Sequence, residues 1–184
     1  RQSGLEAAIL KLAAEGVPVL GVCGGYQMLG EVIHDRSGVE YGKPGSVRGL
    51  GLLPIETTFL PEKSRTRVEA QVLAGPLAGA NLDGYEIHMG TTQVRGAPFC
   101  VLESGQEDGC AQGNVWGTYL HGLFDSGELT QKLAALLCER KGLEPDTAQA
   151  VSHAAYQQTQ LDLLADGVRR ALDMEQIYRV MEEQ

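Results

Sequence analysis

The chain has 184 residues, of which 43% are hydrophobic, and a formal net charge of −9 at pH 7. This length suits about one domain with a sizeable core, and the acidic balance argues against nucleic acid as a partner, because phosphate binding needs basic clusters. No apolar run approaches the ~20 residues that cross a bilayer, and no signal-peptide pattern opens the chain, so we expect no membrane partner.

Cysteine usage indicates the compartment. The four cysteines, at positions 23, 100, 110 and 138, show no C-x-x-C spacing, which argues against a zinc knuckle or a thioredoxin-type motif. They are too few for a disulfide scaffold in a chain of this length. We therefore expect a reducing, cytoplasmic setting and no metal site.

The N-terminal segment predicts a helix, a buried strand and a sharp turn in that order. Ser3 to Glu6 match a capping box, with serine at the N-cap and glutamate at N3, and apolar residues then recur at helical spacing until Gly16. Residues 17–22 form an apolar run typical of a strand, and a short helix-compatible stretch, residues 26–30, follows Cys23. This order indicates α/β alternation around a parallel sheet.

The middle of the chain predicts strands separated by loops. Residues 34–49 are polar and glycine-rich, and we expect a long loop there. Strand character is found in residues 50–60, 67–73, 83–90, 99–103 and 115–124. A turn is predicted at residues 61–64, a loop at 76–83 and a glycine-rich connection at 105–114. The last of the predicted strands carries His121 near its end.

Two helical segments are predicted near the C-terminus. Leucines recur at helical spacing between Glu128 and Gly142, and Pro145 then breaks the pattern. A second helical stretch, from about residue 146 to 183, carries an apolar stripe made of Leu161, Leu164, Val168, Leu172 and Ile177. We expect helices over about 128–184 that pack on the sheet or contact a partner, within a single domain over residues 1–184.

The segment around Cys23 has the pattern of a nucleophile elbow, a strand-to-helix turn that raises one side chain above a sheet. Such a turn imposes strained backbone angles, so its neighbours must be small, as Gly21, Gly24 and Gly25 are. The helix N-terminus beside the sulfur favours a thiolate, and the Gly24 N–H is placed to stabilise an oxyanion. The alternative is a structural cysteine at a tight turn, although a core strand gains nothing from three glycines.

A cysteine nucleophile needs a base, and the candidates are His34, His88, His121 and His153. His121 follows a strand and precedes Gly122, where the backbone can turn it toward a cleft. Its sequence distance from Cys23 is no objection, because such groups are assembled in space. We expect His34 in a surface loop and His153 in a helix. Taken alone, His121 is equally compatible with a structural histidine at a strand end.

Residues 21–27, G-V-C-G-G-Y-Q, resemble the G-x-C-x-G-x-Q signature of the class I, or triad, glutamine amidotransferases. The resemblance implies an α/β fold with a mixed, largely parallel, flavodoxin-like sheet flanked by helices. It also implies that glutamine is hydrolysed at Cys23, with His121 as the base, and that Gln27 helps to hold the substrate. The alternative for Gln27 is a solvent-facing helical residue.

Three further segments, residues 49–53, 84–90 and 117–124, look like signatures of the cobyric acid synthase family, in its C-terminal glutaminase domain. That family uses glutamine and ATP to amidate carboxylates of adenosyl-cobyrinic acid a,c-diamide in cobalamin biosynthesis. The resemblance implies that ATP, Mg²⁺ and the corrinoid bind an N-terminal synthetase domain, which this sequence lacks. It also implies that the first strands of the amidotransferase domain are missing. It implies no cofactor in this chain.

The sequence departs from the wider class at Leu123, two residues after His121, where those enzymes carry a glutamate. We therefore expect a Cys–His dyad, with Glu86 or Asp125 as candidates for orienting the imidazole, and slow glutamine hydrolysis by this chain alone. Glu86 and His88 are also candidates for glutamine binding or for coupling to the synthetase domain. Otherwise they are a polar pair at a strand end that satisfies loop backbone groups.

Other functions stay open from the sequence. Cobyrinic acid a,c-diamide synthase and an amidase of cell-wall lipid precursors carry similar domains. A hypothesis from a different class is a non-catalytic module that keeps the elbow and only docks a partner. A glutamine-like diazo-ketone separates these hypotheses, because it should label Cys23 and no other cysteine if the site works.

Overall fold

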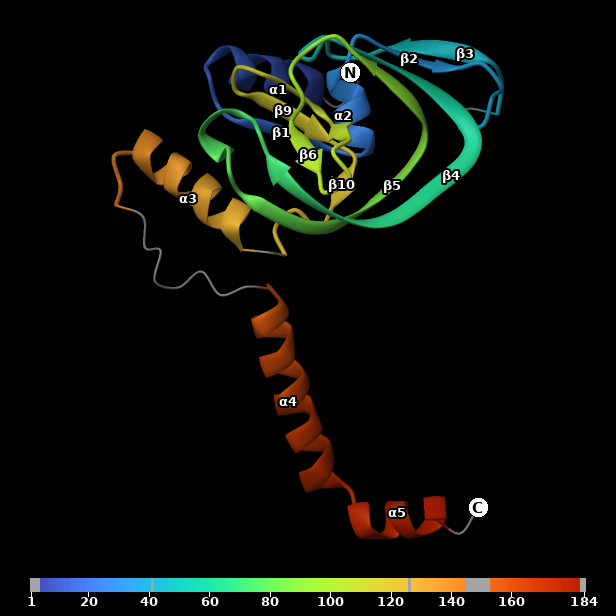
Figure 1. Ribbon diagram of the computed structural model, residues 1–184, viewed down its shortest axis with the longest axis vertical. Coiled ribbons are helices and arrows are strands. Elements are labelled where there is room, and N and C mark those ends of the chain that lie inside the picture. Colours follow the sequence, from blue (N-terminus) through green and yellow to red (C-terminus); the bar gives the residue numbers. More distant parts are fainter. Residues whose placement is uncertain (1–3, 41, 126, 145–152, 183–184) are drawn as a thin grey trace.

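The computed structural model describes residues 4–40, 42–125, 127–144 and 153–182. Helices and strands alternate at the N-terminal end, strands dominate the middle, and helices follow (Figure 1). The helices are α1 (Leu5–Ala14), α2 (Gly24–Leu29), the 3-10 helix η1 (Gly75–Leu77), α3 (Glu128–Arg140), α4 (His153–Ala171) and α5 (Met174–Glu182). The strands are β1 (Val19–Val22), β2 (Val32–Asp35), β3 (Gly45–Arg48), β4 (Ile55–Val72), β5 (Asn81–Val94), β6 (Cys100–Leu102), β7 (Glu107–Asp108), β8 (Cys110–Gln112), β9 (Val115–Thr118) and β10 (Leu120–His121).

The described strands form two sheets. The smaller sheet has the order β1-β9-β8, and the larger one follows β10-β5-β4-β2-β3, with β6 and β7 joined to it through β4. The predicted mixed α/β architecture with flanking helices is confirmed. Fewer strand pairs are parallel than expected: among the described strands, only β1–β9 and β2–β4 pair in parallel. The long antiparallel ribbon of β4 and β5 accounts for this difference.

The predicted helix–strand–turn–helix unit at the N-terminus is confirmed, with one change at its start. Gly4, with a left-handed φ of 76°, occupies the N-cap of α1, and its own residue type offers no capping side chain; Ser3 of the expected capping box lies outside the described residues. The side-chain amide of Asn114 donates to the carbonyl oxygens of Ala13 and Val17, at 3.1 and 2.6 Å. These bonds hold the end of α1 against the start of β1.

Strands occupy a segment where a turn is predicted and parts of a segment where a loop is predicted. β4 runs through residues 61–64, where a turn is predicted, although its register with β5 shifts between Thr58 and Lys63. Pro61 has no N–H to donate to a ladder, so the turn signal marks this bulge and not a chain reversal. The predicted loop at residues 34–49 is wrong at both ends, because β2 and β3 form there and pair antiparallel.

Two groups of buried side chains form the core. The larger group includes Val72, Leu77, Phe99, Trp116, Leu120 and Leu129. The second group packs α2 against the smaller sheet, chiefly through Tyr26 and Tyr119, whose rings meet edge-on with centroids 5.0 Å apart. Because α2 follows Cys23 directly, this packing fixes the turn that carries the cysteine.

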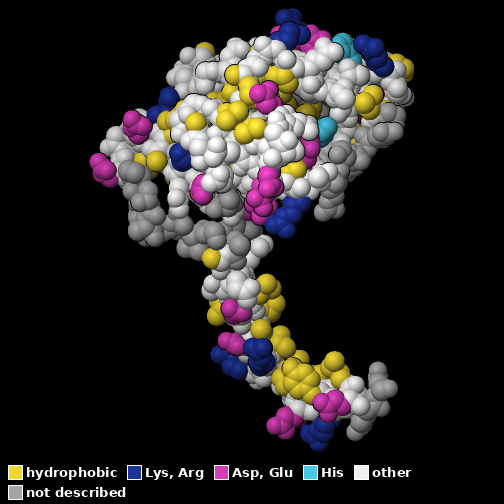
Figure 2. All heavy atoms as spheres, viewed as in Figure 1, with side chains coloured by type: hydrophobic (Ala, Val, Ile, Leu, Met, Phe, Trp, Pro, Cys, Tyr) yellow, Lys and Arg dark blue, Asp and Glu magenta, His cyan; other side chains and the backbone are white. Residues whose placement is uncertain are grey.

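The C-terminal helices differ in their burial. Leu129 of α3 is fully buried, and Lys132 Nζ donates to the Ala78 carbonyl oxygen beside η1. In contrast, α4 and α5 extend away from the sheets (Figure 1), and exposed apolar side chains gather on them (Figure 2). The predicted second helical stretch is interrupted at residues 172 and 173. Among the described residues, no helix has the length and apolar character that a membrane span requires.

Candidate active site

Cys23 lies between β1 and α2 in a backbone conformation that non-glycine residues rarely adopt. Its φ and ψ are 52° and −113°, and no other non-glycine residue that the structure describes has a positive φ. Such a conformation costs about 1–3 kcal/mol and persists only where the surrounding structure enforces it. The strained turn that the sequence predicts at Cys23 is therefore confirmed.

One of the three glycines around Cys23 is required by close packing. A Cβ on Gly21 would lie 2.6 Å from Leu29 Cδ1 and 2.9 Å from the carbonyl carbon of Gly25. A larger residue would therefore push α2 away from β1. A Cβ on Gly24 or Gly25 would meet nothing within 4 Å, so these two glycines leave space beside the turn.

The structure brings Cys23 and His121 to the same short segment of β5. The Cys23 amide donates to the Thr118 carbonyl oxygen at 2.9 Å, and Cys23 Sγ donates to the Ile87 carbonyl oxygen at 3.4 Å. His121 pairs with Tyr85 in the antiparallel β10–β5 ladder. Tyr85 and Ile87 lie two residues apart on one strand, about 7 Å, so the thiol and the imidazole reach β5 at neighbouring positions.

The imidazole of His121 is covered on one face and has one unsatisfied nitrogen. Its ring is parallel to the Tyr85 ring, with centroids 5.2 Å apart and an interplanar angle of 2°. The Nε2 atom is buried and has no hydrogen-bond partner among the described residues. An unpaired buried polar atom costs about 1–3 kcal/mol, and such an atom in a native structure calls for an explanation such as a catalytic role or a bound water.

Gln27, the predicted substrate-holding residue, is buried and does not face solvent. Its Nε2 donates to the Tyr119 hydroxyl at 3.3 Å, and the same hydroxyl hydrogen-bonds Thr92. Burial raises the pKa of the Tyr119 phenol, although these hydrogen bonds act in the opposite direction, so the hydroxyl stays protonated. The network fixes the amide of Gln27 one helical turn beyond Cys23.

Glu86 and His88 form a closely bonded pair. His88 Nε2 lies 2.8 Å from Glu86 Oε1, and His88 Nδ1 lies 3.0 Å from the Gly90 carbonyl oxygen. A carbonyl only accepts, so the Nδ1–H donates to Gly90, and the contact at Nε2 is a hydrogen bond to the Glu86 carboxyl group. The His88 ring also stacks on Tyr119, with centroids 4.1 Å apart. The pair therefore packs against Tyr119, whose hydroxyl accepts the hydrogen bond from Gln27.

A carboxylate that orients His121 would bond Nδ1, because Nε2 faces the nucleophile, and among the described residues neither Glu86 nor Asp125 forms a hydrogen bond with this imidazole. Glu86 follows Tyr85 on β5, so the two side chains point to opposite faces of the strand, and Glu86 is engaged by His88. The Asp125 carboxylate lies over Gly122, where an added Cβ would come 3.1 Å from its Oδ2. The imidazole is therefore oriented in another way.

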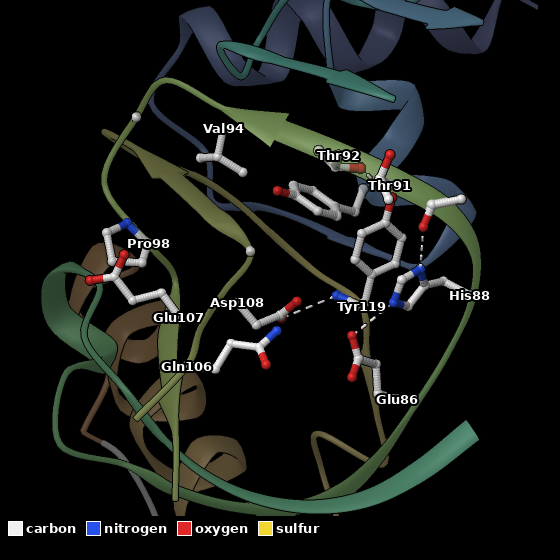
Figure 3. A pocket seen from close by; sticks show the side chains of 14 residues that line it. Glu86, His88, Thr91, Thr92, Val94, Pro98, Gln106, Glu107, Asp108 and Tyr119 are labelled. Atoms are coloured by element: carbon white, nitrogen blue, oxygen red, sulfur yellow. Dashed lines mark hydrogen bonds and ion pairs between the residues drawn. The ribbon is translucent and has the colours of Figure 1, made fainter. Parts of the chain in front are cut away.

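A cavity of about 350 Å³ adjoins the Glu86–His88 pair (Figure 3). One wall comes from β5, and the facing wall comes from the segment around β7, from which Asp108 points inward. The Tyr26 hydroxyl, which is buried without a partner among the described residues, belongs to a further lining residue. Neither Cys23 nor His121 lines this cavity.

Asp108 is a buried acid behind the site. The Thr118 hydroxyl and the Tyr119 N–H, the latter at 3.2 Å, donate to its Oδ2. Burial raises the pKa of the Asp108 carboxyl, and the two hydrogen bonds oppose the rise. Burial also raises the pKa of the neighbouring Cys100 thiol to about 12, which makes Cys100 a core residue and not a competing nucleophile.

The remaining histidines lie apart from this arrangement. His34 is on β2 and not in a loop, and its Nδ1 lies 2.8 Å from Ser46 Oγ. The side chain of His153 lies outside the described part of the chain. Over that described part, no group of three or more His, Cys, Asp or Glu side chains is arranged to hold a metal ion.

Comparison with known proteins identifies the family of this chain. The sequence model of the CobB/CobQ-like glutamine amidotransferase domain matches residues 1–129. The chain belongs to this family. Among relatives of this amidotransferase domain, the cobyric acid synthases of Ruminiclostridium cellulolyticum and Citrobacter koseri are each 44% identical, over 197 and 196 residues. Each alignment covers 100% of this chain but only 38% of the relative.

A solved structure supports the fold of the amidotransferase domain. The structure of PurLQS from Thermotoga maritima matches with a TM-score of 0.51 at 17% sequence identity. The match covers 72% of this chain and 68% of the other. At this identity, the likeness concerns the fold alone.

The motifs of this amidotransferase domain contain the candidate reacting residues, but they do not show which side chains pack against them. Tyr85 lies within the 84–90 motif, yet its stacking on His121 depends on the register between β5 and β10, which are distant in sequence. Tyr119 lies within the 117–124 motif, and its bond to Gln27 joins residues 92 positions apart. No local signal in the sequence predicts such pairings.

Proposed function

We propose that this amidotransferase domain hydrolyses glutamine and supplies ammonia for the amidation reaction of a cobyric acid synthase. The Cys23 sulfur attacks the side-chain amide carbon of glutamine, and its proton passes to His121 Nε2. The imidazolium then protonates the departing nitrogen, so the C–N bond breaks and ammonia leaves a thioester. Water hydrolyses the thioester, which releases glutamate and restores the thiol.

The observation that carries this proposal is the strained backbone of Cys23 together with a buried imidazole nitrogen that has no partner among the described residues, the two groups reaching β5 at Ile87 and Tyr85. A structural cysteine would need no positive φ, and a structural histidine would have both nitrogens satisfied. In the proposal, the Gly24 N–H donates to the oxyanion, and Gln27 contacts the bound glutamine.

The Glu86–His88 pair has two proposed roles. It lies on the face of β5 that lines the cavity of Figure 3 and a second cavity of about 730 Å³ beside Arg67 and Glu103. We assign the pair to glutamine binding or to coupling with the synthetase part, through its contact with Tyr119.

The ligase step belongs to another part of the protein in this proposal. The chain spans 38% of the length of its cobyric acid synthase relatives, and the remaining length is where we place ATP, Mg²⁺ and the corrinoid. That part activates a corrinoid carboxylate with ATP, and ammonia from Cys23 then forms the amide. The names of the relatives support this substrate, and the geometry of this chain supports the glutamine half.

Labelling with a glutamine-like diazo-ketone tests the proposed site directly. We expect peptide mapping by mass spectrometry to find the label on Cys23, and we expect excess glutamine to prevent it. Cys23→Ser should abolish labelling, and Cys138→Ser is the matched control, because Cys138 is also partly exposed. Labelling of Cys138 instead, or labelling of Cys23 that glutamine leaves unchanged, contradicts the proposal.

Steady-state hydrolysis gives a second readout on the same chain. Because Leu123 stands where the wider class carries a glutamate, we expect glutamine hydrolysis by this chain alone to be slow. Cys23→Ser removes the nucleophile and should leave no hydrolysis above background. Brisk hydrolysis by the unmodified chain would contradict the expectation of a two-residue dyad while leaving the nucleophile assignment intact.

A further inference from the structure

The rings of Tyr85 and His121 are stacked in parallel. The planes differ by 2°, with centroids 5.2 Å apart, which is the offset-stacked arrangement that aromatic pairs favour. Tyr85 is 40% exposed, so burial of its ring in the core does not account for its position. The stack covers the imidazole on one face and leaves the edge that carries Nε2 free of partners among the described residues.

The backbone of two strands enforces this stack. His121 and Tyr85 are directly paired across the antiparallel β10–β5 ladder, so their side chains stand on the same face. At the preceding position, a Cβ on Gly84 would lie 2.1 Å from the His121 carbonyl oxygen. Only glycine permits this close approach of the strands. The residue after His121 is Gly122, with a φ of 77°, so the chain turns away immediately and leaves the imidazole against Tyr85.

The position that would otherwise carry an orienting acid is closed. Leu123, two residues beyond His121, is 3% exposed and belongs to the main core cluster. Glu86 is bonded to His88. The imidazole therefore has a phenol ring stacked on one face, while neither Leu123 nor Glu86 supplies the carboxylate that ordinarily orients an acid–base histidine.

We propose that Tyr85 is the positioning residue for His121, an inference that rests on the proposed glutamine hydrolysis. The ring fixes the plane of the imidazole so that Nε2 faces the proton of the Cys23 thiol. It also favours the imidazolium that forms when that proton arrives, because an aromatic face attracts a cation. Tyr85 touches neither substrate nor reacting atoms in this role. The phenol hydroxyl takes no part, so a phenylalanine ring should serve equally well.

Variants of the full 184-residue chain test the assignment through kinetics. Tyr85→Leu should lower kcat for glutamine hydrolysis about tenfold, with KM within about twofold, because the loss falls on proton transfer and not on substrate binding. Tyr85→Phe should restore kcat. Tyr156→Leu, at an exposed tyrosine of α4, is the matched control and should change neither constant.

A spectroscopic signature keeps the test independent of activity. In the folded wild-type chain, the carbon-bound ring protons of His121 should show an upfield ring-current shift in the NMR spectrum. The shift should persist in Tyr85→Phe and disappear in Tyr85→Leu. Absence of the shift in the wild-type chain overturns the stack even if the leucine variant fails to fold.

The outcomes separate this inference from the function on which it rests. If Tyr85→Leu keeps its kcat within about twofold while the diazo-ketone still labels Cys23, the positioning role is wrong and the proposed function stands. If Tyr85→Phe is as slow as Tyr85→Leu, the hydroxyl and not the ring is required, and the inference is overturned. If the wild-type chain neither hydrolyses glutamine nor takes the label at Cys23, the proposed function itself fails.

Discussion

At the scale of single residues, Asp108 shows how burial couples protonation to stability. Its pKa is raised by burial, so the folded chain holds the proton to a higher pH than the unfolded chain does. Stability from this group is complete below the ordinary aspartate pKa of about 3.9 and is lost as the pH rises through the raised folded value. Asp108→Asn mimics the neutral acid and should gain stability relative to wild type as the pH rises, by at most about 1.4 kcal/mol per pH unit.

Urea unfolding of both proteins across the acidic to neutral range measures this difference. The introduced asparagine keeps a carbonyl oxygen that can accept from Thr118, so the variant preserves one native contact. Glu107→Gln is the matched control, because Glu107 is next to Asp108 in the sequence, its carboxylate is exposed, and the substitution removes the same charge. Parallel stability curves for wild type and Asp108→Asn would show that burial does not bias the titration of this carboxyl.

The candidate site was predictable only in part at this scale. The pattern of glycines around Cys23 predicts the strained turn, because few residue types fit such a backbone. The sequence did not indicate that Gln27 is buried against Tyr119. Nor did it indicate that Glu86 is already engaged by His88, since both facts depend on contacts across elements. The catalytic roles of Cys23 and His121 stay predictions that the labelling experiment addresses.

At the scale of elements, Gly117 sets how closely β9 approaches α2. A Cβ at this position would lie 2.2 Å from Tyr26 Cδ2, and the Tyr26 ring is buried and cannot move aside into solvent. We expect Gly117→Ala to lower the free energy of unfolding by about 1–3 kcal/mol, as overpacking of a core does. Chemical denaturation followed by far-ultraviolet circular dichroism provides the measurement.

A second glycine provides the comparison for this prediction. A Cβ on Gly45 in the exposed strand β3 would meet nothing within 4 Å, so Gly45→Ala should change stability by less than about 0.5 kcal/mol. Equal effects of the two substitutions would mean that α2 can shift away from β9 at little cost. The packing that holds the Cys23 turn would then be looser than the distances indicate.

The elements themselves show where sequence patterns stop being informative. Helices α1, α2 and α3 and strands β1 and β9 were predicted because their apolar spacing is local. β4 was predicted as two strands around a turn, since Pro61 and its polar neighbours resemble turn chemistry. Pairing with β5 along both halves keeps the backbone extended there, and this long-range effect has no local signature. β2 and β3 were missed for the same reason, because their mutual pairing, and not apolar alternation, defines them.

At the scale of the whole molecule, the chain has two parts that differ in the burial of their side chains. One part is the sheets with the helices that cover them, and the other is the exposed helices α4 and α5. The core groups take side chains from the N-terminal helix through α3. The helices α4 and α5 contribute no buried residue among those described, and their exposed apolar side chains include Leu161, Leu164, Val180 and Met181. An expected partner contact for these helices stays a prediction, as does the assignment of all 184 residues to one domain.

Truncation after Glu144 tests this division, because it removes α4 and α5 and leaves every described core residue in place. The m-value of urea unfolding scales with the surface that unfolding exposes, so helices that are already exposed add little to it. We expect an unchanged m-value and a thermal midpoint within about 2 °C of the full chain, together with less self-association in size-exclusion chromatography. Leu129→Ala in α3 is the contrasting variant, since Leu129 is fully buried and its loss should cost about 2–5 kcal/mol. A truncated chain that unfolds as readily as Leu129→Ala would mean that the C-terminal helices pack on the sheets in solution.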